Sequence, residues 1–153
     1  MSELTTTISA TLKHKNQQVW SVPPHASVFE AIQRMADKQV GALLVIDPVN
    51  QPGKPLGIIS ERDYARKVIL QGRSSKETTV AEIMSSPVIS VTPNHTVGDC
   101  MRIITDNRIR HLPVMHNGAV VGVISIGDLV NAVISEQSET IRHLQAYISG
   151  VAT

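Results

Sequence analysis

The sequence predicts an α/β protein built from two copies of one βαββα-type repeat. Three observations favour this class. Three segments recur in the same order in the two halves of the chain, helical and strand patterns alternate along each half, and the composition is globular, with 42% hydrophobic and 18% charged residues. Aromatic residues make up only 3%, so we expect an aliphatic core and no aromatic platform for single-stranded nucleic acid.

The repeat is visible as three pairs of matching segments, which are 22–28 with 91–97, 42–46 with 111–115, and 57–63 with 122–128. The spacing between copies is constant for the first two pairs and shorter for the third, because the loop at 47–55 has a shorter counterpart at 116–119. Surface loops absorb such insertions at low cost. Agreement in order, residue type and spacing indicates a duplication.

Each copy is expected to contain the same elements in the same order. An extended stretch comes first, then a helix that opens with a capping box (Ser27 with Glu30, Thr96 with Asp99), a buried apolar strand, a second strand and a second helix. The predicted bounds are 19–22, 27–38, 42–46 and 56–59 in the first copy, 88–91, 96–107, 112–115 and 120–124 in the second, with second helices starting at Ser60 and Ser125.

Three further segments lie outside this pattern: a helical stretch at 5–14, a polar linker at 71–77 with a short helix at 79–84, and a final helix from 128 to about 148. We therefore predict the division 1–18, 19–70 (first repeat), 71–84, 85–134 (second repeat) and 135–153. Because a unit of two or three strands is only marginally stable, we expect the two sheets to pack face to face around a pseudo-twofold axis.

Charge and motif content exclude several functions. A net charge of +1 gives no long-range field for DNA or an anionic membrane, and no apolar run approaches the roughly 20 residues that span a bilayer. We expect no metal, because the histidines form no HExxH motif. A single cysteine and the absence of a signal-like start favour a cytoplasmic location. Cys100 lies on the apolar face of its predicted helix, so we expect it to be a core residue.

The most informative motif is the segment from Gly57 to Asp63, with its copy at 122–128. In both, a strand ends and a serine and an aspartate open a helix. Backbone N–H groups at a helix start favour phosphate, and a carboxylate there can accept hydrogen bonds from the two hydroxyls of a ribose. The same Ser-x-x-Asp pattern is also a capping box that needs no ligand.

These residues resemble those of a tandem pair of CBS domains, a Bateman module, of the stand-alone bacterial signal-transduction type. The resemblance runs from about Val19 to Ile134, and it is carried by the two Gly-h-h-Ser-x-x-Asp segments (h, hydrophobic), the Leu112-Pro113-Val114 strand, the Pro23 and Pro93 turns and the helix with Met35. It implies clefts between the repeats that bind an adenine nucleotide such as AMP, ADP, ATP, NAD or S-adenosylmethionine. Such pairs commonly associate as dimers.

The resemblance also implies roles for individual residues. Asp63 and Asp128 would hold ribose hydroxyls, and Ser60 and Ser125 would line the phosphate end. The residues that would flank adenine are Ser21, Val22, Val40, Gly41 and Ala42 in one cleft, and Ser90, Val91 and Ile109 in the other. Arg110 and His111 would reach phosphate from the opposite repeat.

Positive charge is unequally divided between the copies. Arg62, Arg66 and Lys67 lie near Asp63 in the sequence, whereas the second copy has Ile126, Gly127 and Asn131 at the corresponding places. If Arg110 and His111 reach across, positive charge gathers around the Asp63 cleft, and we expect that cleft to be the better phosphate site. Two alternatives stay open: the basic residues form a solvated helix face, or Arg110 and His111 protect a strand edge.

The sequence thus predicts an adenine-nucleotide sensor that is not an enzyme. Since 153 residues leave no room for a catalytic, channel or DNA-binding domain beside the repeats, we expect it to act on an unidentified protein partner or through its own homodimer. The alternatives are a ligand-free dimerisation scaffold and an enzyme that processes nucleotides, for which we find no paired base or metal-binding carboxylates.

Overall fold

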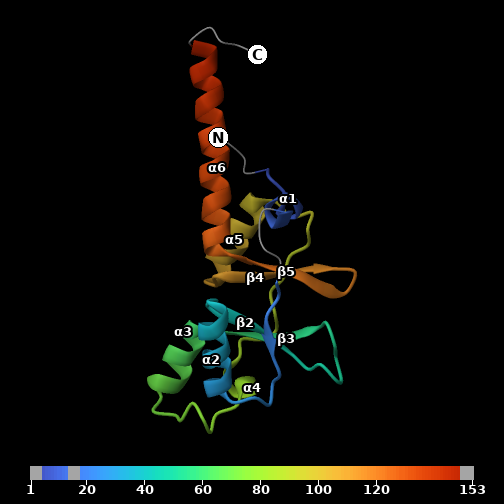
Figure 1. The fold of residues 1–153 in the computed structure, drawn as a ribbon, viewed down its shortest axis with the longest axis vertical. Helices are drawn as coiled ribbons and strands as arrows, with labels where there is room; N and C mark the ends of the chain where they lie inside the picture. The colour runs from blue at the N-terminus through green and yellow to red at the C-terminus, as the bar shows by residue number, and fades with distance from the viewer. Residues whose placement is uncertain (1–4, 14–17, 149–153) are drawn as a thin grey trace. The chain divides into compact units, whose positions relative to one another are not determined.

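A computed structural model describes residues 5–13 and 18–148 (Figure 1). The chain divides into two compact units, described separately below: Gln17–Ser90 with Pro113–Val123, and Met1–Asn16 with Val91–Leu112 and Ile124–Thr153. No helix in the described part of the chain is long and apolar enough to cross a membrane. The elements are α1 (Ile8–Lys13), β1 (Ser21–Val22), α2 (Val28–Lys38), β2 (Ala42–Ile46), β3 (Pro55–Ser60), α3 (Glu61–Tyr64), η1 (Ala65–Ile69), α4 (Val80–Ile83), α5 (Val97–Asn107), β4 (His111–His116), β5 (Ala119–Ser125) and α6 (Ile126–Ile148).

The predicted βαβ unit is confirmed in the first repeat. Strand β1 runs parallel to β2, with Ser21 opposite Leu44, and α2 forms the crossover between them. Strand β3 then pairs antiparallel to β2, with Ala42 opposite Ser60. The outer edge of β3 is closed at one point, where Ser85 and Ile58 exchange backbone hydrogen bonds of 2.8 and 3.0 Å. This register places Ser60 at the end of a buried strand, directly before a helix.

The core of this unit is aliphatic, as predicted. It is formed by the inward faces of α2, β2, β3, η1 and α4, which contribute Val28, Ala31, Met35, Leu43, Val45, Ile59, Val68, Val80 and Ile83. The ring of Trp20 lies at its border, beneath the side chains of Arg34 and Lys38. Full burial of one such aliphatic side chain stabilises a fold by about 1.5–3 kcal/mol, so this core fixes the positions of the strand ends.

The other unit contains α1, α5 and α6, together with residues 111–112 of β4 and 124–125 of β5. Strands β4 and β5 form a hairpin whose turn, at Asn117 and Gly118, belongs to the first unit; their φ angles of 52° and 79° fit a type I′ turn. Cys100 and Leu129 are fully buried, and α5 and α6 pack against each other. Cys100 is therefore a core residue, as predicted.

Helices α1 and α4 occupy equivalent positions in different repeats. In each case two backbone hydrogen bonds of 2.8–2.9 Å hold the start of the short helix to the start of a repeat helix. At α4 the N–H of Val80 donates to the carbonyl of Ala26, and the N–H of Val28 donates to the carbonyl of Thr78. At α1 the N–H of Ile8 donates to the carbonyl of His95, and the N–H of Val97 donates to the carbonyl of Thr6. Helix α4 therefore completes the first repeat, whereas α1, which precedes the first repeat in sequence, completes the second. The alignment of the two repeats did not predict this correspondence, because α1 and α4 do not stand at matching places in the sequence.

The capping box predicted at Thr96 is confirmed, because Thr96 and Asp99 exchange both of its hydrogen bonds. The box predicted at Ser27 forms only in part: the Ser27 hydroxyl accepts from the backbone N–H of Glu30 at 3.1 Å, without the return bond from the Glu30 side chain. Helices α2 and α5 both end at a left-handed residue, Gln39 and Arg108, each with φ of 55°.

The predicted strand at 88–91 is wrong. Residues 88–90 form no strand, and Val91 makes a single bridge. Proline has no N–H to donate, so Pro87 and Pro93 leave only a short interval in which this stretch can pair.

Candidate functional site

The helix start at Ser60 and Asp63 is the most densely hydrogen-bonded polar site of the first repeat. The Asp63 side chain is only 11% exposed. Its Oδ2 atom accepts from the Ser60 backbone N–H at 2.9 Å and from the Ser60 hydroxyl at 3.1 Å, while that hydroxyl accepts from the Asp63 backbone N–H at 3.2 Å. The predicted capping box is therefore present, and it holds one carboxylate oxygen in a fixed direction.

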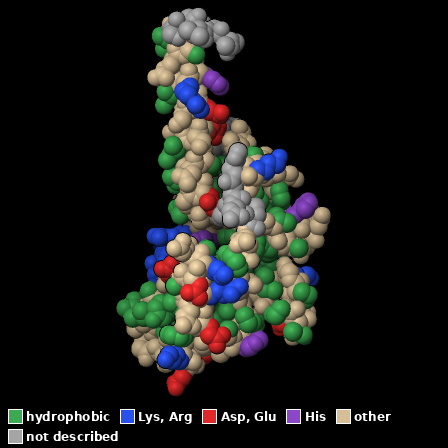
Figure 2. All heavy atoms as spheres, viewed as in Figure 1, with side chains coloured by type: hydrophobic (Ala, Val, Ile, Leu, Met, Phe, Trp, Pro, Cys, Tyr) green, Lys and Arg blue, Asp and Glu red, His purple; other side chains and the backbone are tan. Residues whose placement is uncertain are grey.

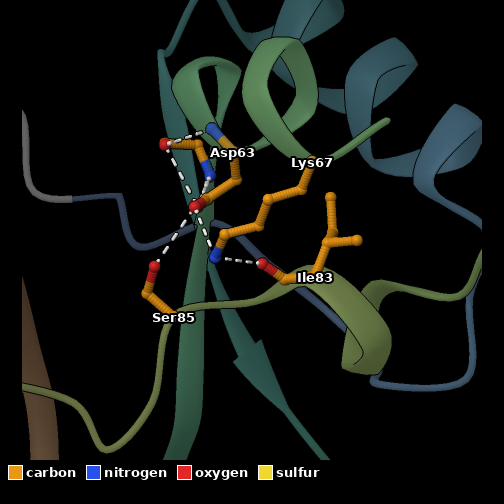
Figure 3. A network of polar contacts seen from close by, with 5 residues as sticks. Asp63, Lys67, Ile83 and Ser85 are labelled. Atoms are coloured by element: carbon orange, nitrogen blue, oxygen red, sulfur yellow. Dashed lines mark hydrogen bonds and ion pairs between the residues drawn. The ribbon is translucent and has the colours of Figure 1, made fainter. Parts of the chain in front are cut away.

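The second oxygen of Asp63 contacts side chains from further along the chain (Figure 3). Lys67 Nζ lies 3.1 Å from Oδ1, and the Ser85 hydroxyl donates to the same atom at 3.2 Å. The Lys67 ammonium also donates to the carbonyl oxygen of Ile83 at 2.9 Å. The carboxylate thus joins the helix start to the linker segment that closes the edge of β3.

Lys67 comes from η1, a π-helical turn that directly follows α3. Such turns are rare, and they occur often at functional sites. The matching part of the second repeat is the regular helix α6, in which Ala132 takes the place of Lys67. An aminoalkyl chain is therefore present beside the helix start in one copy only.

The second helix start repeats the cap geometry. The backbone N–H of Ser125 donates to Asp128 Oδ2 at 2.8 Å, and the backbone N–H of Asp128 donates to the Ser125 hydroxyl at 3.1 Å. The Asp128 side chain is half-buried. Both copies therefore present a serine and an aspartate at a helix start in the same local arrangement.

A backbone hydrogen bond joins each helix start to the residue that precedes the first strand of the adjacent pair, β2 in the first repeat and β4 in the second. The N–H of Glu61 donates to the carbonyl of Gly41 at 3.1 Å, and the N–H of Ile126 donates to the carbonyl of Arg110 at 2.9 Å. Segments 40–42 and 109–111 therefore lie directly beside Ser60 and Ser125, respectively. This is where a ligand held by one helix start would also meet strand residues of the same repeat.

A pocket of about 480 Å³ opens beside the first helix start. It lies between the end of α2 and α3, and its lining is mostly apolar, consisting of Ile32, Met35, Ala36, Gln39, Val40, Gly41, Glu61 and Tyr64. Its size is typical of small-molecule sites. Val40 and Gly41 are two of the residues predicted to flank a base.

The predicted site residues fall into two groups, one in each unit. Ser21, Val22, Val40, Gly41, Ala42, Ser60, Arg62, Asp63, Arg66 and Ser90 lie in one unit, and Val91, Ile109, Arg110, His111, Ser125 and Asp128 lie in the other. Val22 and Val91 are core residues, 4% and 1% exposed, so their side chains are not available to a ligand.

Sequence reasoning missed Ser85 and the Ile83 carbonyl as partners of the Asp63 network. Ile83 ends α4, between the predicted repeats, and Ser85 is the first residue of the predicted second repeat. They reach this network because Ser85 pairs with β3, which brings its hydroxyl to Asp63 and the Ile83 carbonyl to Lys67. No motif signals this contact.

Metal and thiol chemistry find no support in the described residues. In residues 5–13 and 18–148, no three His, Cys, Asp or Glu side chains gather as they would around a metal ion. Burial raises the pKa of the Cys100 thiol to about 11, and the nearby Asp99 carboxylate adds to the rise. A thiol with this pKa is a poor nucleophile at neutral pH.

Comparison with known proteins places the duplication in a family. Residues 15–69 and 80–135 each match the CBS domain. The chain is 44% identical over 152 residues to the mitochondrial CBS domain-containing protein CBSX3 of Arabidopsis thaliana, an alignment that covers 95% of this chain and 73% of the relative.

Solved structures agree. A protein with CBS domains from Burkholderia ambifaria is 47% identical, with a TM-score of 0.80 over 86% of this chain and 96% of that one. A CBS domain protein from Pyrobaculum aerophilum, solved in complex with AMP, is 30% identical, with a TM-score of 0.70 over 80% of this chain and 88% of that one.

Proposed function

The chain belongs to the CBS-domain family as a tandem pair, and from that premise we propose that it is a regulatory module that binds an adenine nucleotide. The observation that carries the proposal is the pair of helix starts at Ser60–Asp63 and Ser125–Asp128, which share one cap geometry. The AMP complex of the Pyrobaculum aerophilum protein supports the ligand class. AMP, ADP, ATP and NAD share the adenosine group that these positions would recognise.

At the first site, we assign ribose to Asp63 and the phosphate end to Ser60. A carboxylate accepts hydrogen bonds from vicinal hydroxyls, and the first turn of a helix presents free N–H groups to an anion. The other residues we assign to this site are Arg62 and Arg66 for phosphate, and Ser21, Val22, Val40, Gly41 and Ala42 for adenine. The pocket lined by Val40 and Gly41 supports the adenine position.

At the second site, Asp128 and Ser125 take the corresponding roles. Ser90, Val91 and Ile109 would flank the base there. Apart from these residues, we assign Arg110 and His111 to phosphate binding without tying them to the Asp128 site; His111 begins β4 and Arg110 precedes it, where the first repeat has Ala42 and Gly41. The guanidinium group of Arg110 can bind a phosphate through two parallel hydrogen bonds.

We assign no catalytic step to this module. The serine hydroxyls are engaged as helix caps, and no described cluster of carboxylates or histidines provides a metal centre. Nucleotide binding then acts by changing the interaction with a protein partner or the oligomeric state of the chain. The functional repeats in this proposal are 19–70 and 85–134.

The assembly we propose is a homodimer to which α6 contributes. Val130, Ile134, Ile141, Leu144 and Ile148 follow one another at intervals of three, four or seven residues along this helix. The last four are each more than half exposed, and Figure 2 shows hydrophobic side chains along one edge of α6.

This spacing fits a short heptad repeat, with Ile134, Ile141 and Ile148 at a positions, Val130 and Leu144 at d positions, and the polar Gln137 at the d position between them. Isoleucine at a with leucine at d favours a parallel two-stranded coiled coil. The flanking e positions, at residues 131, 138 and 145, carry no charge, so a second copy meets no like-charge repulsion there. A membrane surface is a poorer fit, because the polar face of α6 carries Arg142 as its only lysine or arginine.

A thermal-shift panel of AMP, ADP, ATP, NAD and S-adenosylmethionine tests the proposal. A ligand that binds only the folded state at 100 times its Kd adds about 2.7 kcal/mol of stability, or roughly 5–10 °C in Tm for a chain of this size. Ribose 5-phosphate without the base should give a much smaller shift. If none of the five ligands shifts the Tm at millimolar concentration, the chain is a scaffold that needs no ligand.

A further inference from the structure

We infer that Lys67 competes with ribose for the Asp63 carboxylate, so that the first site favours ligands that carry a phosphate. This inference rests on the proposed function, which it sharpens by separating nucleotides from nucleosides. It concerns a residue outside the Ser-x-x-Asp motif, and it follows from the contacts shown in Figure 3.

The acceptor capacity of Asp63 is fully used. A carboxylate offers about four lone-pair positions. Two on Oδ2 are taken by the N–H and hydroxyl of Ser60, and two on Oδ1 are taken by Lys67 Nζ and the Ser85 hydroxyl. A ribose that donates two hydroxyl hydrogen bonds must therefore displace existing donors.

The donors on Oδ1 are the ones that can leave. The Oδ2 bonds belong to the helix cap and involve a backbone N–H, so their loss would disturb the start of α3. Lys67 and Ser85 reach Oδ1 through side chains alone. Of the two, Lys67 carries the charge, and its departure leaves a largely buried carboxylate with neutral donors only.

A phosphate changes the balance of this exchange. The ammonium group of Lys67 loses an ion pair with Asp63 when ribose arrives, and a nucleoside offers no replacement. A nucleotide brings an anion, which lysine binds as a point charge. The Lys67 side chain is 44% exposed, so its stem is free to redirect the ammonium group. Competition therefore lowers the affinity for adenosine more than the affinity for AMP.

The second repeat lacks a lysine at this position, because Ala132 stands at the place of Lys67. Introducing a lysine there tests whether this position by itself raises the preference for AMP over adenosine.

The experiment is calorimetric titration with adenosine and with AMP in an Asp128→Asn background, which isolates the first site. Lys67→Met keeps the length and apolar stem of the side chain and removes its charge. We expect this change to strengthen adenosine binding by about fivefold, the scale of a part-exposed ion pair, and to leave AMP binding equal or weaker. The ratio of the two Kd values should fall accordingly.

Three further variants sharpen the test. Lys67→Arg keeps a cation within reach and should keep the parent ratio. Lys54→Met removes a lysine of the same unit that lies outside the network, and it should also keep the parent ratio. Ala132→Lys introduces the competing cation into the second repeat, where it should weaken adenosine binding when studied in an Asp63→Asn background.

The failures of the inference and of the proposed function are distinguishable. If Lys67→Met folds, binds AMP and keeps the parent ratio, Lys67 is a structural contact and the inference is wrong. If the parent chain binds neither AMP nor adenosine, the proposed function is wrong, and the inference falls with it. Should Lys67→Met unfold, Lys67→Gln gives the same comparison with a side chain that can still donate to the Ile83 carbonyl.

Discussion

Ser60 and Asp63 are joined by three hydrogen bonds, two ending on Oδ2 of the aspartate and one on the hydroxyl of the serine. This arrangement is a complete helix cap. It also leaves the other carboxylate oxygen, Oδ1, to contact Lys67 in the next helical turn and Ser85 beside β3. A cap and a ligand site therefore share one residue, and a substitution must separate the two roles.

Asp63→Asn is the substitution that separates them. Asparagine keeps the size of the side chain and one acceptor oxygen, so the loss of stability should stay within the roughly 0.5–2 kcal/mol of a lost cap. If Asp63 also binds ribose, the substitution should weaken AMP binding as well, because hydrogen bonds to a charged group contribute about 1.5–3 kcal/mol each. AMP affinity at the first site should then fall at least about tenfold in calorimetry.

The matched controls are Asp128→Asn and 2′,3′-dideoxy-AMP. Asp128→Asn should affect only the second site, and the dideoxy ligand should bind parent and Asp63→Asn protein alike at the first site. If Asp63→Asn loses stability and still binds AMP as tightly as the parent, Asp63 is a cap alone.

Arg110→Ala tests the phosphate assignment. A guanidinium group that contacts phosphate contributes to AMP binding and not to adenosine binding, so AMP affinity should fall about tenfold or more while adenosine affinity stays near the parent value. Calorimetry with both ligands measures this. Arg108→Ala, two residues away at the end of α5, is the control. Equal losses for AMP and adenosine would place Arg110 outside the phosphate site.

Ile141→Asp tests the assembly through α6. A charge at a central a position of the seam would be buried without a partner, so the dimer should weaken by at least about tenfold in sedimentation equilibrium. His143→Asp introduces the same residue on the opposite face of the helix and should leave association unchanged. A parent protein that is monomeric at tens of micromolar would contradict the dimer itself.

The Cys100 thiol gives a prediction that depends on pH. Because its pKa is raised to about 11 by burial, the folded state holds this proton at pH values where the unfolded chain has released it. The resulting stability is complete below the ordinary thiol pKa and is lost as pH rises toward the folded value. A thiol reagent should therefore label the native protein very slowly at pH 8 and label the protein in denaturant at once. Rapid labelling of the native protein would mean that Cys100 is accessible.

The sequence by itself determined the features that depend on local pattern. The helices at 28–38 and 97–107, the strand at 42–46 and the two Ser-Asp helix starts follow from apolar spacing and capping chemistry, which act within a few residues. The duplication supports each of these predictions, because the same pattern occurs in both repeats. Family membership came from the same residues.

Tertiary structure alone decided which distant segments meet. Ser85 reaches Asp63 because it pairs with β3, and α1 completes the second repeat although it precedes the first. The strand predicted at 88–91 is reduced to one bridge, since pairing depends on the neighbour as much as on the residues themselves. Lys67 shows the difference most clearly: its charge was evident in the sequence, but its hold on the Asp63 carboxylate depends on a π-helical turn and on the linker carbonyl at Ile83. Contacts of this kind are set by burial and chain path, which no local pattern encodes.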